Sequence, residues 1–492
     1  MNKKENKISK EIKINKKSAR KNYSNQTGIT LIALVVTIVA LLILAGVSIN
    51  AIFSENGIIE YARNAKAKTG LAEEEEKTKI GNLEDLIGDT LTGIKVEKVQ
   101  DEKPGELEKE NDTTFVINSI EDLVVFSYMV TSGNDTFVNK TVKLGQDLDF
   151  NSTKSYISPY RKDYAKYGYN GELKTILTEN EGFKTIGIAT ADGKDKSFQG
   201  TFDGNNHTIY NLYMHIEGNH DGKEKRGLFA SNFGTIKDLK LKNVNLSLKH
   251  NNAEKNSPLG AICAVNASSG QVNNCYVSGK IQNDSVDSST GGIAGFSSGI
   301  ITNCGNMSDI KCIGNNNVYV GGIAGNTNNQ ISKSYNIGKI YASGKKVYVG
   351  GIIGSLGGNK CENCFNTGDV TGICSEKLRQ GGIIGVCTGN VSNCYSIGKI
   401  VNETTEPEAE TSVGLVIGKV NGKIWSIMIY CLKQEQLPAI GNTTTEENII
   451  KTESEMKTEE FLELLNTNQT PLVWELNPSK NNGYPNLIGV GN

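Results

Sequence analysis

The sequence predicts a mainly β protein, a β-solenoid of about 30-residue repeats preceded by a long transmembrane α-helix. Glycine-centred pentapeptides recur along the second half of the chain, for example GGIAG from Gly291 and GGIIG from Gly381. A second motif, such as NCYSIGKI from Asn393, recurs with nearly the same spacing. A fixed period of this length is typical of stacked repeats. The helix is indicated by 25 uncharged, mostly apolar residues at 29–53.

The N-terminal apolar run has a strongly basic flank. Residues 1–27 carry nine Lys or Arg against two Glu, a net charge of +7. The run is long enough to span a bilayer as a helix, and a cleaved secretory signal has a shorter apolar core. Basic residues hold their flank in the cytoplasm. We therefore expect a single-pass protein of the cell membrane, with its N-terminus cytoplasmic before processing and its bulk outside.

The start of this run, Gly-Ile-Thr-Leu-Ile-Ala-Leu-Val-Val at 28–36, resembles the cleavage and methylation motif of type IV prepilins. The resemblance implies that a prepilin peptidase cuts between Gly28 and Ile29 and methylates Ile29. It also implies that the apolar helix packs among other pilin or pseudopilin subunits. The family usually has Glu at the fifth mature position, where this chain has Ala33. This departure favours a place at a filament tip, or in the membrane, over an abundant shaft subunit.

Shifts in composition divide the chain into six segments. The stretch KVEKVQDEKPGELEKEND at 95–112 is charged and contains few apolar residues, as is typical of a linker. We expect a leader at 1–28, a transmembrane and extended pilin-like helix at 29–93, a charged linker at 94–112, the first solenoid turns with an N-terminal cap at 113–226, the repeats at 227–435, and a C-terminal cap at 436–492.

The repeat units have the pattern of strands. Each contains several Gly and short Ile or Val runs bounded by Gly, Asn and Ser, without a long stretch of 3.6-residue periodicity. The same position of each repeat unit holds a glycine, which would let the backbone bend sharply or pass close to the neighbouring turn. These signature positions are Gly260, Gly292, Gly322, Gly351, Gly382 and Gly414.

The units resemble GLUG repeats of bacterial surface proteins, over roughly residues 113–435. The resemblance implies a β-helix, for which we expect a right-handed parallel arrangement, and display at the cell surface. Some proteins with these repeats are zinc peptidases that cleave immunoglobulin A. The zinc motif H-E-x-x-H begins at none of the four histidines, His207, His215, His220 and His250, so we expect no metal and no cofactor.

Short segments at the two ends have the patterns of caps. Ser119 and Asp122 are spaced as a helix-start capping pair, and Leu123, Phe126 and Met129 would then face the first turn as a lid. Glu459–Leu465 is expected to form a short amphipathic helix in the terminal cap that a solenoid requires.

All ten cysteines fall within 263–431. An even number in an exported chain suggests disulfides, and Cys361-x-x-Cys364 suggests a redox or metal site. The repeat register favours buried free thiols instead. The slot of Cys275, Cys304, Cys364 and Cys394 holds Ser334 in one unit, and Cys361 replaces Val272, Ile301, Ile331 and Val391. All three interpretations remain open from the sequence.

Two further groups of polar residues have a regular spacing. Asn274, Asn303, Asn363 and Asn393 form a ladder that we expect to hydrogen-bond at a turn. Asp147, Asp149 and Asp203 are candidates for the carboxylates of a β-helix glycosidase or lyase.

The predicted function is display of a binding surface, most consistent with adhesion. Without the leader, 43 basic and 52 acidic residues remain, so the exported chain does not suit nucleic acid. We expect a non-enzymatic, pilus- or pseudopilus-associated protein that binds a glycan or a matrix protein. Two alternatives stay open: a carbohydrate-active β-helix enzyme, which requires a cleft lined by carboxylates, and a plain structural spacer.

Overall fold

The computed structural model describes residues 106–150, 177–178, 182–183, 185–188, 196–218, 226–250, 256–422, 428–434, 437–443 and 449–491. Val99–Asn492 forms one compact unit, and Met1–Lys98 is a second unit that lies outside the described residues. The predicted leader, membrane helix and processing site fall in that second unit. Among the described residues, no helix has the length and apolar character of a membrane span.

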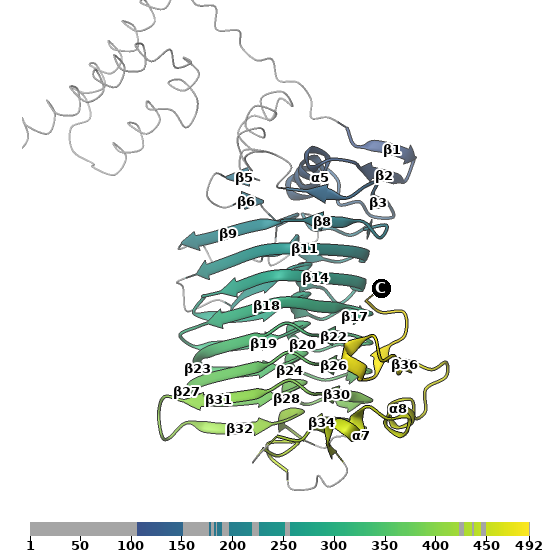
Figure 1. The fold of residues 1–492 in the computed structure, drawn as a ribbon. Helices are drawn as coiled ribbons and strands as arrows, with labels where there is room; N and C mark the ends of the chain where they lie inside the picture. Colours follow the sequence, from purple (N-terminus) through teal and green to yellow (C-terminus); the bar gives the residue numbers. More distant parts are fainter. Residues whose placement is uncertain are drawn as a thin grey trace, which may run out of the picture. The chain divides into compact units, whose positions relative to one another are not determined.

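Residues 229–420 form the repeating turns of a β-solenoid (Figure 1). One side of every turn contributes a short strand to a seven-stranded parallel sheet in which each strand pairs with its equivalent one turn later. Its strands are β10 (Phe229–Asn232), β13 (Cys263–Asn266), β16 (Ala294–Ser297), β20 (Ala324–Thr327), β24 (Ile353–Leu356), β28 (Ile384–Cys387) and β33 (Ile417–Val420). The predicted β-solenoid is confirmed, and its handedness stays a prediction.

A larger, bent sheet completes the turns. Its long strands are β11 (Thr235–His250), β14 (Gln271–Asn283), β18 (Gly305–Ile313), β23 (Ile340–Gly350) and β27 (Val370–Gly381). Further strands are β12 (Asn256–Gly260), β15 (Asp287–Gly291), β17 (Ile300–Thr302), β19 (Asn317–Gly321), β21 (Ile331–Ser332), β22 (Tyr335–Asn336), β25 (Lys360–Glu362), β26 (Phe365–Asn366), β29 (Asn390–Ser392), β30 (Cys394–Ser396), β31 (Ile400–Thr404), β32 (Glu410–Gly414), β34 (Ile429–Leu432) and β35 (Ile450–Lys451).

The solenoid interior is a set of columns in which equivalent side chains stack from turn to turn. Alternate residues of a strand point inward, so parallel pairing in register brings like positions together. The predicted column of Val272, Ile301, Ile331, Cys361 and Val391 is confirmed by strand pairing and by nearly complete burial of each member. The repeat period therefore determines which side chains stack on one another in the core.

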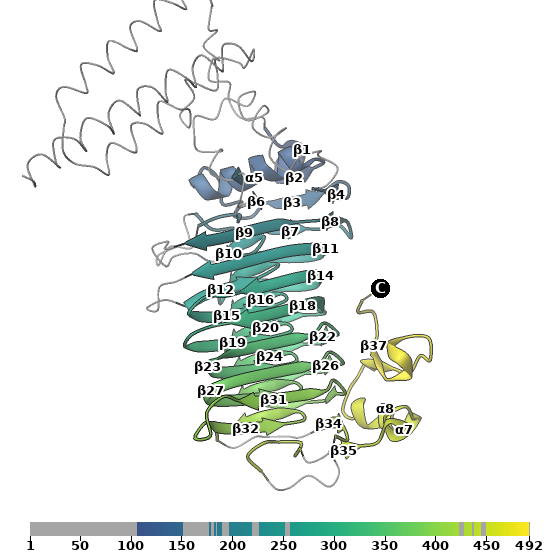
Figure 2. The same cartoon turned by 60° about the vertical axis from the view of Figure 1, so that its left-hand side comes forward.

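The N-terminal part places a helix over one end of the solenoid (Figures 1 and 2). Helix α5 (Ile120–Ser132) begins at Ser119, whose side chain accepts a hydrogen bond from the Asp122 backbone N–H at 3.1 Å. The predicted capping pair is thus confirmed. The strands of this part are β1 (Glu108–Asn111), β2 (Thr114–Ile117), β3 (Thr141–Leu144), β4 (Leu148–Asp149), β5 (Leu177–Thr178), β6 (Gly182–Phe183), β7 (Thr201–Asp203), β8 (Thr208–Tyr210) and β9 (Tyr213–Gly218).

Strand β1 corrects the predicted boundary of the linker. Residues 108–111 were expected in the linker at 94–112, yet they pair antiparallel with β2. All four are exposed, so their strand has no apolar alternation that a sequence pattern would reveal. Backbone pairing with the next strand, Thr114–Ile117, holds them instead.

Residues 437–443 and 449–451 of the cap expected at 436–492 lie on the last turn, where Ile440 pairs with Ile417 and Ile450 pairs with Cys431. The C-terminal segment, defined as residues 452–491, differs from that expectation. It runs along one flank of the solenoid instead of closing its end (Figures 1 and 2). Its elements are α7 (Glu453–Met456), α8 (Glu459–Leu465), β36 (Trp474–Glu475), the 3-10 turn η2 (Asn481–Gly483) and β37 (Asn486–Leu487). The predicted helix at Glu459–Leu465 is confirmed.

An outward-facing aromatic column explains this position. Tyr335, Phe365 and Tyr395 stack in successive turns, with ring centroids 5.2 and 5.4 Å apart and planes within 9°. Trp474 packs on Phe365 and Tyr395, and Phe461 packs on Tyr395. The column would expose a large apolar surface without this cover, so the segment is held by hydrophobic burial.

Candidate functional site

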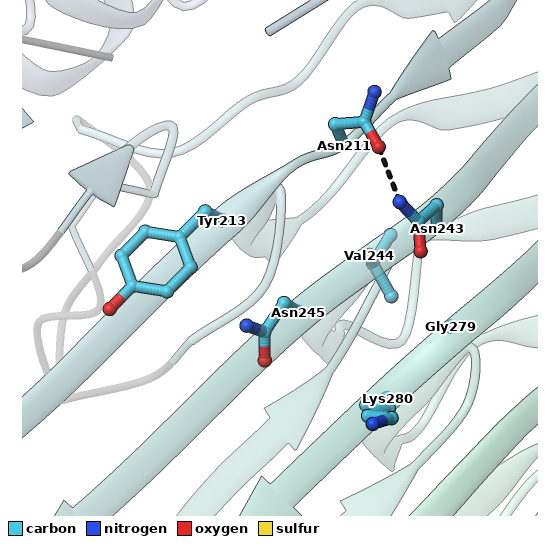
Figure 3. Close-up of a pocket in the computed structure, with 7 residues that line it drawn as sticks. All are labelled: Asn211, Tyr213, Asn243, Val244, Asn245, Gly279 and Lys280. Atoms are coloured by element: carbon cyan, nitrogen blue, oxygen red, sulfur yellow. Dashed lines mark hydrogen bonds between the residues drawn. The ribbon is translucent and has the colours of Figure 1, made fainter. Parts of the chain in front are cut away.

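A surface pocket lies on the outer face of three successive turns (Figure 3). Tyr213 of β9, Asn245 of β11 and Lys280 of β14 are paired neighbours across the parallel strands. Asn211, Asn243, Val244 and Gly279 complete the lining, and the cavity volume is about 480 Å³. Because like positions stack in a solenoid, a surface site is assembled from residues about 30 positions apart.

A backbone irregularity creates the hollow. Asn211 and Asn243 both have left-handed backbone conformations, with φ of 60° and 56°. The register of β11 against β14 shifts between Leu241 and Val244, as in a β-bulge. The Asn243 amide donates to the Asn211 side-chain oxygen (Figure 3), and the Asn211 amide donates to Asp149 at 2.7 Å. The rim is therefore fixed by hydrogen bonds.

The lining offers mixed polar chemistry beside an aromatic ring. Asparagine amides both donate and accept hydrogen bonds, and Asn245 is exposed at the centre of the site. Lys280 is exposed as well, and its ammonium group makes no ion pair with another described residue. Tyr213 adds an amphipathic ring. Such a surface can hold a hydroxyl-rich ligand by directed hydrogen bonds and ring contact.

The predicted catalytic carboxylates are engaged in contacts between turns. Asp147 accepts a hydrogen bond from the Thr208 backbone at 2.8 Å and lies 3.2 Å from His207 Nδ1. Asp203 pairs with Lys237 at 2.5 Å. The third, Asp149, holds the asparagine pair of the pocket rim. The pocket itself and the two further pockets described, near 397–437 and 314–405, are lined without a carboxylate.

The asparagine ladder occupies a corner of the turns. Asn274, Asn303, Asn363 and Asn393 all have left-handed backbone conformations, with φ of 52–53°. Asparagine tolerates this conformation better than most residues. The side chains of Asn363 and Asn393 also hold the C-terminal segment, through Trp474 Nε1 at 3.1 Å and the Leu465 carbonyl at 2.8 Å. The ladder is therefore structural.

A second, fully buried asparagine ladder was missed by sequence reasoning. The Asn306 amide donates to Asn336 at 2.7 Å, and the Asn336 amide donates to Asn366 at 2.8 Å. Asn336 and Asn366 also donate to the carbonyls of Gly338 and Gly368. The Asn-x-Gly spacing at 336–338 and 366–368 is the sequence signal that would have found it.

Close packing against this inner asparagine ladder explains why glycine occupies several of the signature positions. A Cβ atom at Gly322 would overlap the Gly351 carbonyl oxygen and the Asn336 side chain, and one at Gly351 would overlap Asn366. Gly292 and Gly382 occupy the equivalent position against Asn306 and Ser396, while Gly260 and Gly414 face crowded backbone. The glycines therefore act in packing between turns. The processing residues Gly28 and Ile29 lie outside the described residues.

All ten cysteines are buried and carry free thiols. The Sγ atoms of Cys361, Cys364 and Cys394 lie within 4.8 Å of one another. Burial raises the pKa of the Cys364 thiol well above its usual range. Burial opposes ionisation of Cys394 too, but hydrogen bonds from the Cys361 and Cys364 thiols and the Cys364 N–H lower its pKa to about 5. These hydrogen bonds favour the thiolate form of Cys394.

Comparisons with known proteins add little to this geometry. No protein-family model matches the chain, and no curated protein matches it. One similar solved structure is from Bacteroides ovatus and is described as a "putative immunoglobulin A1 protease". It is 18% identical with a TM-score of 0.45, and the match covers 79% of this chain and 95% of that one. At this identity and TM-score the likeness assigns neither a fold nor a function, and the fold is defined by the strand pairing described above.

Proposed function

We propose that this protein is a non-enzymatic, surface-displayed adhesion protein whose solenoid binds an extracellular glycan. The observation that carries the proposal is the pocket in which Tyr213, Asn245 and Lys280 stand side by side on three turns. Binding sites combine a few oriented polar groups with aromatic surface, and sugar hydroxyls match the donors and acceptors of amides.

The chemistry of the lining favours binding over hydrolysis. Glycoside hydrolysis ordinarily requires two carboxyl groups that flank the scissile bond. The pocket lining contains none, and Asp147 and Asp203 are committed to contacts with Thr208 and Lys237. A glycan would therefore be held at this site without cleavage.

A membrane anchor completes the proposal. The basic leader and the apolar core at 29–53 suit a helix that holds the solenoid outside the cell. We propose that a prepilin peptidase cuts after Gly28 and that the chain joins other pilin or pseudopilin subunits at a filament tip or stays in the membrane. Ala33 supports the tip, because it leaves a buried terminal amine without a carboxylate partner.

Mass spectrometry tests the processing step. The intact mass of membrane-extracted protein should correspond to a chain that begins at methylated Ile29. A chain that keeps residues 1–27 in cells with an active prepilin peptidase would leave a simple anchor in place of the pilin-like one.

A glycan array tests the binding step. Detergent-solubilised full-length protein should bind a defined set of glycans, and Tyr213→Ala or Asn245→Ala should weaken that binding at least about tenfold. Tyr341→Ala is the matched control, because this half-exposed tyrosine lies on β23, away from the pocket. Absence of any bound glycan, or equal binding by all variants, would contradict the proposal and favour a matrix-protein ligand or a spacer. Release of sugar products would favour the enzyme.

A further inference from the structure

The three neighbouring thiols come from two consecutive turns of the solenoid. Cys361 lies in β25, Cys364 follows that strand, and Cys394 begins β30 one turn later. Their sulfur atoms are mutually within 4.8 Å, and none of the three side chains is exposed. The Cys364 backbone N–H approaches Cys394 Sγ at 3.4 Å. The sulfur atoms therefore face one small, dry space.

The arrangement is unlike the other cysteines of the same column. Cys275 and Cys304 are also stacked in consecutive turns, but the residues that accompany them in the aliphatic column are Val272 and Ile301. Only Cys361 replaces an aliphatic side chain in that column among its described members. This single replacement converts a pair of stacked thiols into a cluster of three.

The residues around the three thiols favour a metal ion with only three ligands. Zinc in structural sites takes four ligands. The nearest carboxylate in sequence, Glu362, is bound to Lys360 Nζ at 2.7 Å and to the Gln330 amide at 3.0 Å, so it does not supply a fourth ligand. Thiolates are soft ligands and select soft ions such as Cu(I).

We propose that Cys361, Cys364 and Cys394 form a binding site for one Cu(I) ion, held by three sulfur ligands inside the solenoid. Each thiol that binds as a thiolate releases its proton to solvent, and the copper keeps its oxidation state. Because the site is buried, the ion is taken up while these two turns form, and it then links them.

The test uses full-length protein, reduced and refolded without oxygen in the presence of Cu(I). We expect one copper per chain by elemental analysis, with sulfur-to-copper charge-transfer absorption, and retention against a competing Cu(I) chelator. Cys361→Val removes one of the three sulfur ligands and should weaken binding by more than about 100-fold, because loss of an outer-shell partner alone costs about 10–100-fold. Cys275→Ser is the matched control and should bind like the natural sequence.

Folding of the variants is checked separately by far-ultraviolet circular dichroism. Cys361→Val should fold, because Val272 and Val391 occupy the same column. If it does not fold, Cys364→Ser replaces it, since Ser334 fills that slot in another turn. The proposal is wrong if refolded protein takes up no Cu(I), if both variants and the control bind alike, or if Zn(II) displaces the copper.

Discussion

The helix α5 and the C-terminal segment both cover apolar surface of the solenoid, but they cover different surfaces. The helix closes an end, where Phe126 packs against Phe137, Phe198, Phe202 and Phe229 of the first turns. The C-terminal segment covers a flank, where Trp474 and its neighbours pack on the aromatic column. An uncovered end of a solenoid exposes the apolar interior, whereas an uncovered flank exposes only the outward-facing side chains of its strands.

The two covers are therefore expected to affect different processes, namely global unfolding of the solenoid and local detachment of the C-terminal segment. The helix belongs to the same buried cluster as the solenoid interior. The C-terminal segment forms a second cluster with the outward aromatic rings. We therefore expect damage at α5 to weaken the whole solenoid, and damage at the segment to release the segment alone.

The largest effect is expected for Phe126→Ala. The ring is fully buried among four other phenylalanines, and truncation of a buried Phe costs about 3–5 kcal/mol. Urea denaturation should show this loss in the global free energy of unfolding. Val138→Ala, at a side chain that is 49% exposed, should change it by less than about 0.5 kcal/mol. A loss under about 1 kcal/mol for Phe126→Ala would mean that the helix does not seal the end.

A local effect of similar origin is expected for Trp474→Ala. This side chain is 1% exposed and donates to Asn363, so its loss should cost the segment about 3 kcal/mol. Hydrogen exchange should accelerate in 452–491 while the strands of the solenoid keep their protection. Leu472→Ala, at 63% exposure, serves as the control. Equal acceleration in both regions would show that the two clusters are one.

The next smaller effect is expected at alkaline pH, which should destabilise the contacts of the C-terminal segment more than those of α5. Burial raises the pKa of Tyr276 to about 12 and also raises that of Tyr395, whereas the four rings that surround Phe126 are phenylalanines and do not titrate. An unfolded tyrosine has a pKa of about 10. The stabilisation is therefore complete below about pH 10 and is lost as pH rises through the folded value, by up to about 1.4 kcal/mol per unit for a buried phenol.

Fluorescence of Trp474 follows this release, in a Trp425→Phe background that leaves it as the sole tryptophan. The emission should shift red above about pH 10 while circular dichroism of the strands persists. Replacement of Tyr276 by Phe should move the onset to higher pH. A pH-independent emission up to the point of global unfolding would argue that the segment does not detach separately.

The smallest effects are expected at the helix caps. Ser119→Ala removes the bond to the Asp122 N–H and should lower global stability by about 1 kcal/mol. Thr452→Ala removes the exposed capping box of α7 and should leave the global free energy of unfolding unchanged. Both free energies of unfolding are measured by urea denaturation. Equal losses for the two variants would contradict the view that α5 stabilises the whole solenoid while the C-terminal segment does not.

Much of the solenoid could be predicted because its pattern is periodic. The spacing near 30 residues placed Cys361 in the column of Val272 and Val391, and strand pairing agrees. The Ser119 cap followed from local hydrogen-bond chemistry. Both features depend on nearest neighbours, either along the chain or one repeat away.

The features that could not be predicted depend on contacts without a period. Tyr395 was visible in its repeat, but the sequence did not show that its ring faces outward beneath Trp474. The pocket depends on a bulge near Asn243, which follows from the folded sheet. The approach of Cys361 to Cys394 required side-chain geometry across two turns.

The hydrogen bond from the Gly491 N–H to the Tyr276 hydroxyl, 2.7 Å long, joins residues 215 positions apart. A stacked-repeat protein ordinarily couples only adjacent units, so it can fray one repeat at a time from its open end. Here the final residues reach back past several repeats, and the intervening ones cannot peel away while that contact and the aromatic packing persist. The C-terminal segment thereby couples repeats that are not adjacent, so that they unfold together as one cooperative block for as long as residues 452–491 stay docked.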